Sequence, residues 1–326
     1  MSHFTNYKSL YQSLFFIPFF LIFTACTEVE QEQLTISSSP WPGFEPLYLA
    51  RDKGFFDSNK VRLFELPSAD ITMESFRNHS TDLASLPLDA TLELLDEGTK
   101  LRILLIMNIS NGGDAVMVKP GIKKLSDIKG KRISVVNIPL GLYMLNRLLD
   151  KAGLQRNDVE VFLMAETQQE EFYDKGKADV IITFDPIKTR LAKKGMHVLF
   201  DSSDIPNEIF DILVAHEDAY KNNFDDICEI GKQWFKTLEY MKSNHKKTSE
   251  YIGKRLGVDA DSYNEMMKGL IVPSIAENSK LLTGDDAGLL DSAKKLSSIM
   301  KKEKQLSKIV DVSAALDSRF MECVSK

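Results

Sequence analysis

Residues 82–107 read DLASLPLDATLELLDEGTKLRILLIM and predict a strand–helix–strand unit. The first strand is residues 82–86, Pro87 opens the helix, and the helix ends near Gly98. Residues 101–107 follow as an apolar run, which is typical of a strand buried at the centre of a parallel sheet. The stretch therefore predicts an α/β fold with right-handed crossovers.

The same alternation of strands and helices extends to both sides of this unit. On the N-terminal side, residues 34–39 and 61–66 form predicted strands, and each is followed by a predicted helix. On the C-terminal side the alternation restarts, with strands predicted at residues 115–118, 132–136, 159–164, 180–183 and 198–200. Residues 209–214 then form a strand that returns to the first set. Everything from Asp225 to the C-terminus has helical periodicity.

This order of elements predicts two α/β lobes, with the second inserted into the first. Lobe one comprises residues 34–113 and 216–326, and lobe two comprises residues 114–215. A chain of 326 residues is long enough to build two hydrophobic cores. Ligands bind to such sheets where the carboxyl ends of strands meet helix N-termini, so we expect a ligand cleft between the lobes.

The composition excludes several classes of protein. With 41 Lys and Arg against 47 Asp and Glu, the net charge is −6, so no nucleic-acid partner is expected. The 17 glycines and 11 prolines are too few for a collagen-like or disordered chain. The three cysteines are too few for a disulfide scaffold or a cysteine-rich zinc module.

The N-terminus has the pattern of an export signal. Residues 14–23 read LFFIPFFLIF, which is shorter than the roughly 20 apolar residues of a membrane span and fits the core of a secretory signal peptide. The small residues before Cys26 resemble the lipobox of bacterial lipoproteins, in which that cysteine is lipidated. We expect a signal peptide over residues 1–25, a tether over residues 26–33, and a protein in the periplasm with a lipid anchor in a bacterial membrane. A simple cleaved signal with a chance cysteine is the alternative.

The two remaining cysteines, Cys228 and Cys323, both lie in the C-terminal region. In an oxidising compartment they could form a disulfide. The sequence favours two unpaired buried thiols instead. Neither is a candidate nucleophile, because no His/Asp constellation accompanies them.

Four segments resemble a known family. Residues 39–56 (SPWPGFEPLYLARDKGFF) are similar to the opening of ABC-transporter substrate-binding proteins of the nitrate/sulfonate/taurine and thiamine-precursor (NMT1/THI5-like) group. Residues 110–115 (SNGGDA) resemble the stretch between the lobes of that family, and residues 125–133 (LSDIKGKRI) resemble the start of its second lobe. Residues 178–186 (ADVIITFDP) resemble its strand ending in an aromatic residue, an acid and a proline. The resemblance implies a type 2 periplasmic binding protein, a two-lobed clamp that closes on a small ligand and delivers it to an ABC permease.

Because ligands bind at the carboxyl ends of strands, we expect seven loops to form the walls of the cleft. They are residues 39–44, 67–70, 86–89, 108–114, 137–143, 165–168 and 183–186. These loops contain no Lys or Arg. Their candidate ligand-binding acids and rings are Trp41, Phe44, Asp70, Asp89, Asp114, Tyr143, Glu166, Phe184 and Asp185. Their candidate hydrogen-bonding residues are Ser68, Ser110 and Asn137.

The charges of these loops favour one class of ligand. An uncompensated buried carboxylate costs several kcal/mol or takes up a proton. A protonated amine or basic heterocycle would relieve that cost, and the aromatic faces would add cation–π contact. We therefore expect a nitrogen-containing ligand that is cationic, zwitterionic or neutral. Helix N-termini can hold an anion unaided, so a nitrate, sulfonate or taurine-type ligand remains the alternative.

Each candidate residue also has a structural interpretation. Asp70 and Asp185 suit helix capping, Asp89 suits the first turn of a helix, and Asp114 beside two glycines could brace a hinge. Tyr143 and Phe184 could simply pack within lobe two. Trp41 lies between two prolines and is the hardest to explain as core, so we expect it to line the cleft.

No enzyme is indicated. The five histidines show no metal-ligand spacing, and no phosphate-binding glycine loop or GxSxG nucleophile elbow is present. The family includes a fungal-type pyrimidine-precursor synthase, but the cysteine-rich segment of that enzyme has no counterpart in this sequence. We expect a monomer without a cofactor that serves an ABC importer. Docking of the loaded clamp on a membrane sensor, such as a histidine kinase or a diguanylate cyclase, is the second hypothesis.

Overall fold

The computed structural model describes Met1, residues 33–283 and residues 288–326. The body of the predicted signal peptide, the predicted lipidation site Cys26 and the tether as far as Glu32 lie outside the described residues. Residues Gln33–Lys326 form one compact unit. None of the described helices combines enough length with enough apolar character to cross a membrane.

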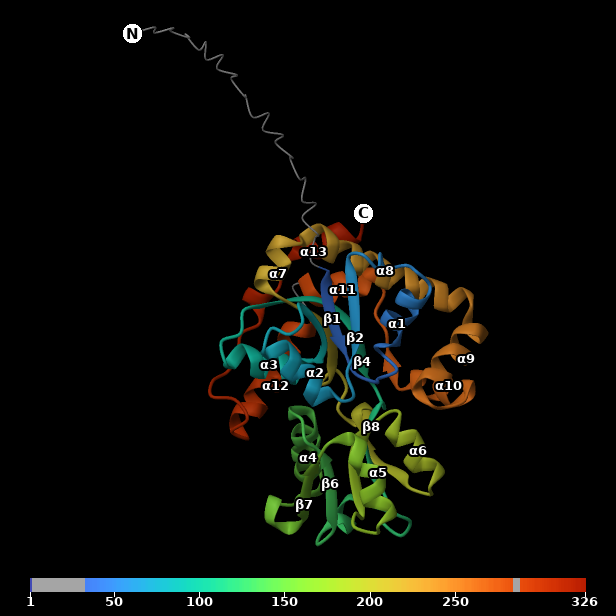
Figure 1. Ribbon diagram of the computed structural model, residues 1–326. Helices are drawn as coiled ribbons and strands as arrows, with labels where there is room; N and C mark the ends of the chain where they lie inside the picture. The colour runs from blue at the N-terminus through green and yellow to red at the C-terminus, as the bar shows by residue number, and fades with distance from the viewer. Residues whose placement is uncertain (2–32, 284–287) are drawn as a thin grey trace. The chain divides into compact units, whose positions relative to one another are not determined.

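The first sheet has six strands in the order β11-β4-β10-β3-β1-β2. Their bounds are β1 (Leu34–Ser38), β2 (Val61–Glu65), β3 (Leu83–Pro87), β4 (Leu101–Ser110), β10 (Phe210–His216) and β11 (Leu270–Ile271). Strand β1 pairs in parallel with β2 and β3, whereas β10 runs antiparallel between β3 and β4. We call the part built on this sheet lobe one, and it is the upper part in Figure 1.

The second sheet has five strands in the order β7-β6-β8-β5-β9. Their bounds are β5 (Asp114–Val118), β6 (Arg132–Val136), β7 (Glu160–Met164), β8 (Val180–Phe184) and β9 (His197–Asp201). Strand β6 pairs in parallel with β7 and β8, and β5 runs antiparallel to β8 and β9. We call the part built on this sheet lobe two, and it is the green and yellow lower part in Figure 1.

Helices cover both sheets. Those that follow strands in lobe one are α1 (Glu45–Asp52), α2 (Ala69–Arg77) and α3 (Leu88–Asp96), and those in lobe two are α4 (Pro139–Ala152), α5 (Glu166–Asp174) and α6 (Ile187–Lys193). The C-terminal helices are α7 (Glu217–Asn222), α8 (Phe224–Ser243), α9 (His245–Leu256), α10 (Ala260–Lys268), α11 (Ile275–Thr283), α12 (Gly288–Lys302) and α13 (Ser318–Val324). Proline in the first turn fixes the start of α4, and Gly153 in the left-handed conformation ends it.

Two predictions about the path of the chain are wrong. The boundary of lobe two at residue 215 falls inside β10, and all seven residues of that strand are buried in the first sheet. The chain has therefore returned to lobe one by Phe210, as expected for the strand over residues 209–214, and only the boundary at residue 215 is wrong. The region from Asp225 onward is not wholly helical, because β11 extends the first sheet by pairing with β4. The rest of the predicted division into lobes stays a prediction.

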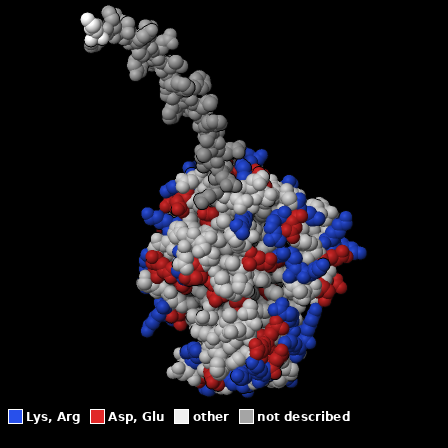
Figure 2. All heavy atoms as spheres, viewed as in Figure 1, with Lys and Arg blue, Asp and Glu red and all other residues white. Residues whose placement is uncertain are grey.

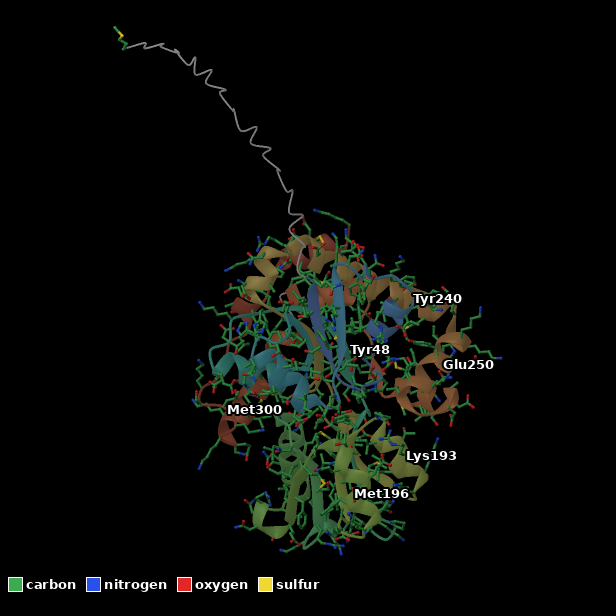
Figure 3. All side chains as sticks on the ribbon, viewed as in Figure 1. Tyr48, Lys193, Met196, Tyr240, Glu250 and Met300 are labelled. Carbon is green, nitrogen blue, oxygen red and sulfur yellow. A yellow bond between two sulfur atoms is a disulfide. The ribbon has the colours of Figure 1, made fainter. Side chains whose placement is uncertain are left out.

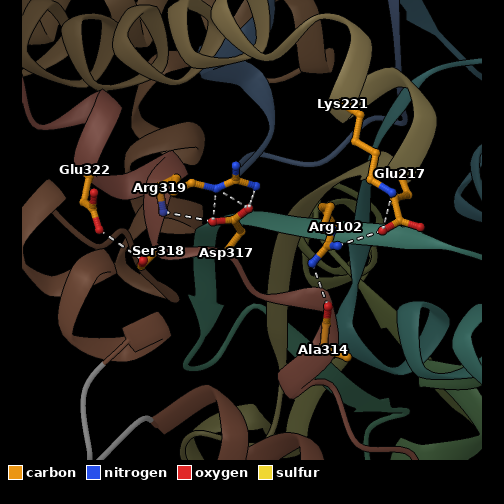
Figure 4. Close-up of polar contacts among 8 residues, drawn as sticks. All are labelled: Arg102, Glu217, Lys221, Ala314, Asp317, Ser318, Arg319 and Glu322. Carbon is orange, nitrogen blue, oxygen red and sulfur yellow. Dashed lines mark hydrogen bonds and ion pairs between the residues drawn. The ribbon is translucent and has the colours of Figure 1, made fainter.

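The C-terminal segment is fastened to lobe one. Cys228 on α8 and Cys323 on α13 form a disulfide, with their Cα atoms 6.2 Å apart, so the prediction of unpaired thiols is wrong. The two cysteines are 95 residues apart, and the packing of α13 on α8 brings them within the distance that a disulfide requires. Arg102 on β4 adds a second attachment by donating to the carbonyl oxygen of Ala314 at 2.7 Å (Figure 4).

Charged side chains of both signs are mixed on the surface. On the face drawn in Figure 2, Lys and Arg are interspersed with Asp and Glu, and no continuous basic stripe crosses the described residues of that face. That face therefore lacks the electrostatic footprint of a nucleic-acid-binding surface.

Candidate ligand-binding site

A narrow cavity of about 30 Å³ lies between the two lobes. That volume holds only two or three water molecules, by the rule of roughly 10–15 Å³ for each. A guest of metabolite size therefore does not fit the cavity in this form of the protein. The cavity is lined by Ser39, Trp41, Phe44, Ala69, Ser85, Leu86, Pro87, Asp114, Ile138, Leu140, Phe184 and Asp211.

Aromatic rings meet across the cavity. Trp41 of lobe one stands edge-on to Phe184 of lobe two, with ring centroids 5.8 Å apart and planes at 89°. The Trp41 indole Nε1 donates to Asn108 Oδ1 at 3.3 Å, and a turn closed by the Phe44 amide and the Trp41 carbonyl holds the loop. Gly113 allows this arrangement, because a Cβ there would lie 2.8 Å from Trp41 Cη2.

Three carboxyl groups gather at the base of this site. Asp89, Asp114 and Asp211 are 2%, 3% and 5% exposed. Burial raises the pKa of Asp89 to about 7 and that of Asp114 to about 6. Burial raises the pKa of Asp211 well above its usual value, and the nearby Asp114 and Asp89 raise it further. The three groups therefore resist carrying three negative charges together.

Several buried polar atoms near these acids make no hydrogen bond within the described residues. They are Ser85 Oγ, Asp89 Oδ2 and Asn108 Nδ2. Buried polar atoms in folded proteins are almost always satisfied, so each of these needs an explanation. Of the three residues only Ser85 lines the cavity, so a polar guest there could bond to its hydroxyl group.

One cation approaches the acids from lobe two. Lys188 on α6 donates to the carbonyl oxygen of Gly112 at 2.6 Å and to Asp185 Oδ2 at 3.4 Å. Its charge lowers the pKa of Asp114 in part, against the larger effect of burial. The predicted loops contain no Lys or Arg, and Lys188 was not among the candidates because it is the second residue of α6, two positions beyond the last loop.

The remaining predicted residues lie around the cavity without lining it. Asp185 accepts from the Thr189 amide in the first turn of α6 at 3.0 Å, although the N-cap residue of that helix is Pro186 and not Asp185. Tyr143 donates to Glu208, and Asn137 is exposed. The others form local contacts: Ser68 with Asp70, and Ser110 with Ser202 and the Asp114 amide. Whether any predicted residue binds a ligand stays a prediction.

Glu166 joins the lobes at the edge of the cavity. Its Oε1 accepts from the amide of Ala69, the first residue of α2, at 3.1 Å. The first amides of a helix have no partner within the helix and attract negative charge. A side-chain carboxylate of lobe two therefore occupies a donor on which an anionic guest could bind.

Further contacts hold the lobes together away from the cavity. Glu208 is buried and accepts from Arg147 on α4 at 2.9 Å and from Lys295 on α12 at 2.5 Å. Lys193 on α6, labelled in Figure 3 below α10, pairs with Asp259 at 3.2 Å. These pairs connect the second lobe with the C-terminal helices.

Asp211 was missed by the sequence analysis. The rule for parallel sheets selects the carboxyl ends of strands, whereas Asp211 is the second residue of the antiparallel β10. It pairs with Pro87 at the end of β3 and with Asn108 near the end of β4. An antiparallel strand begins at the edge where its neighbours end, so an acid at its start reaches the same cavity. An Asp inside the apolar run FDILVAH was the signal available in the sequence.

Comparison with known proteins identifies the fold and a family. A family model described as NMT1/THI5 like matches residues 41–267. A search of curated protein sequences gives no match. Among solved structures, the alkanesulfonate-binding protein SsuA from Xanthomonas axonopodis pv. citri bound to MOPS is similar, with a TM-score of 0.74 and 16% identity over 88% of this chain and 99% of that one.

Two more solved structures share the architecture. The periplasmic aliphatic sulphonate-binding protein SsuA from Escherichia coli gives a TM-score of 0.71 at 17% identity, over 87% of this chain and 91% of that one. The periplasmic nitrate-binding protein NrtA from Synechocystis PCC 6803 gives 0.69 at 11% identity, over 91% of this chain and 89% of that one. The two-lobed periplasmic binding protein fold expected from the sequence is confirmed.

Proposed function

Because the chain belongs to the NMT1/THI5-like family, we propose that it is an extracytoplasmic solute-binding protein of an ABC importer. In this role the lobes close on a small molecule, and the closed form delivers it to a permease in the bacterial inner membrane. The lipid anchor predicted at Cys26 would keep the protein beside that membrane. The similarity to solute-binding proteins for sulfonates and nitrate supports the role, and so does the presence of a cavity between the lobes.

We infer that the guest carries a protonated or hydrogen-donating nitrogen. The observation that carries this inference is the group of three buried carboxyls, Asp89, Asp114 and Asp211. A cation between them would stabilise their ionised forms, which burial otherwise opposes. Contact with Trp41 and Phe184 would add roughly 0.5–2 kcal/mol through cation–π attraction.

An anionic guest is the second candidate, and a specific observation bears on it. The similar structures are named for sulfonates and nitrate, and the N-terminus of α2 opens at the cavity through Ala69. In this chain, however, Glu166 already accepts from the Ala69 amide. A sulfonate would have to displace that carboxylate and then lie near three more, so the nitrogen-containing guest is favoured.

A thermal-shift screen tests the class of guest. Residues 27–326 would be screened against amines, amino acids, pyrimidines, nitrate and sulfonates, and a guest at 100 times its Kd stabilises the fold by about 2.7 kcal/mol. We expect hits that carry a nitrogen donor, and we expect Asp114→Asn to weaken them. Hits restricted to nitrate or sulfonates would overturn the inferred class while leaving the binding role intact.

An uptake experiment separates import from signalling. Deletion of the gene should abolish uptake of the labelled hit if the protein serves an importer. Unchanged uptake together with a lost transcriptional or second-messenger response would support the alternative of docking on a membrane sensor. A permease gene and an ATPase gene beside this one favour import, and a lone sensor gene favours signalling.

A further inference from the structure

Two histidines and an aspartate meet at the end of lobe one that faces away from the cavity. His79 follows the C-terminus of α2, His216 is the last residue of β10, and Asp218 is in the first turn of α7. One ligand atom from each lies within 4.8 Å of the others, and this is the one such group found among the described residues. His216 lies five positions beyond Asp211 along β10, or roughly 16 Å at about 3.3 Å for each position. The group is therefore separate from the proposed ligand site.

The tautomer of His216 is fixed by the backbone. Its Nε2 lies 2.8 Å from the carbonyl oxygen of Phe76, which can only accept, so Nε2 carries the proton. The lone pair is then on Nδ1, and that atom is buried without a hydrogen-bond partner. The residue is 2% exposed, so a missing partner is not replaced by bulk water. Metal-binding histidines have this arrangement, with one ring nitrogen bound to a carbonyl and the other free for the ion.

The His79 ring lies on one face of the His216 ring. It stacks on His216 with ring centroids 3.7 Å apart and planes at 14°, while Phe76 stacks on the opposite face at 3.9 Å. Parallel rings do not aim their lone pairs at one point, so coordination requires the His79 ring to tilt out of the stack. His79 is exposed and lies beyond the end of α2, so this rotation meets no core packing.

The third group, Asp218, lies in a segment that neighbouring ion pairs hold in place. Glu217, the neighbour of Asp218, accepts from Arg102 at 2.7 Å and from Lys221 at 3.2 Å, which ties α7 to β4 (Figure 4). The Asp218 carboxyl is exposed, and among the described residues it accepts only from the next amide, that of Ala219 at 3.0 Å. Its oxygen can therefore turn toward the two rings.

Packing alone accounts for part of this arrangement. The three-ring stack and the bond to Phe76 are sufficient to hold the His216 ring. They leave the buried Nδ1 lone pair without a donor, however, and they do not explain why a carboxylate joins the two imidazoles.

We propose that His79, His216 and Asp218 bind a first-row transition-metal dication such as Zn²⁺ or Co²⁺. Two imidazole nitrogens and one carboxylate oxygen suit these borderline ions, with water completing the coordination. The hard ions Mg²⁺ and Ca²⁺ prefer sites made of oxygen and would compete poorly. The ion would tie the segment after α2 to the corner between β10 and α7. This proposal does not depend on which ligand the cavity between the lobes binds.

Metal titration of residues 27–326, without an affinity tag and after treatment with a chelator, tests this site. The segment contains the whole compact unit Gln33–Lys326. We expect one equivalent of Co²⁺ to bind with visible d–d absorption, Zn²⁺ to displace it, and excess Mg²⁺ or Ca²⁺ to leave it in place. Calorimetry with Zn²⁺ gives the dissociation constant.

The variants are made at His79 and Asp218 because both side chains are exposed. His79→Ala and Asp218→Asn should each raise the Zn²⁺ dissociation constant at least tenfold. His245→Ala, which removes an exposed histidine on α9, is the matched control and should change nothing. Absence of saturable one-to-one binding, or equal affinity in all three variants and the wild type, would overturn the proposal.

Discussion

Replacing Asp89 by Asn should stabilise the fold at pH 8 and destabilise it at pH 4. A rise in pKa from 3.8 to about 7 corresponds to about 4 kcal/mol, at about 1.36 kcal/mol for each step of one in pKa. Because its folded-state pKa is above the unfolded value, the contribution of Asp89 to stability is greatest below pH 4 and falls as pH rises through 7. Above pH 7 the folded state holds a buried carboxylate at its full cost.

The amide side chain introduced by Asp89→Asn cannot ionise, so the variant avoids that cost at high pH. The new amide group, however, has a buried N–H at the position of Asp89 Oδ2, where no hydrogen-bond partner is available. Leaving that N–H unpaired costs about 1–3 kcal/mol at every pH. We therefore expect the variant to be more stable than the wild type by about 1–3 kcal/mol at pH 8. At pH 4 we expect it to be less stable by a similar amount.

Urea unfolding of the guest-free protein at pH 4, 6 and 8 measures this difference. Asp261→Asn, on the exposed side of α10, is the matched control and should shift the unfolding free energy by less than about 0.5 kcal/mol throughout. A difference between Asp89→Asn and the wild type that does not vary with pH would refute the assignment of a desolvated carboxyl to this position.

Three other changes test separate parts of the structure. Trp41→Ala removes the ring that faces lobe two and should raise the Kd of the guest about tenfold, measured by calorimetry, with a melting transition retained; an unchanged Kd would remove the indole from the site. Replacing Cys228 and Cys323 together by Ser should lower the unfolding free energy by about 4 kcal/mol, because the bond closes a loop of 95 residues; melting curves that are insensitive to reductant in the wild type would contradict this. Gly113→Ala places a Cβ 2.8 Å from Trp41 Cη2 and should weaken guest binding through the displaced ring; wild-type affinity would show that the indole position is not critical.

The sequence predicted local elements well because their signals are local. Proline and glycine mark the ends of the helices, and the apolar runs of β4 and β8 appear as uninterrupted segments. Trp41, Phe44, Asp114 and Phe184 were selected by the rule for strand ends and do line the cavity. That rule works because the carboxyl ends of parallel strands lie at the same edge of a sheet.

The missing parts depend on contacts between distant residues. Asp211 reaches the cavity only because β10 runs against its neighbours, and strand direction is not encoded in its own residues. Cys228 and Cys323 meet through the packing of two helices. His79 and His216 are 137 positions apart and become neighbours only when α2 packs beside the end of β10. No spacing rule along the chain can detect such pairs.

The carboxylate of Glu166 has a consequence for selectivity. It is attached to the protein, so its effective concentration at the α2 amide is set by the linkage and not by the surroundings. If the cavity binds the guest as we propose, an acidic solute would compete with this attached carboxylate for the Ala69 amide, whereas a basic solute would meet no such competitor there. Discrimination by charge would then begin at the rim, ahead of contact with the three inner acids.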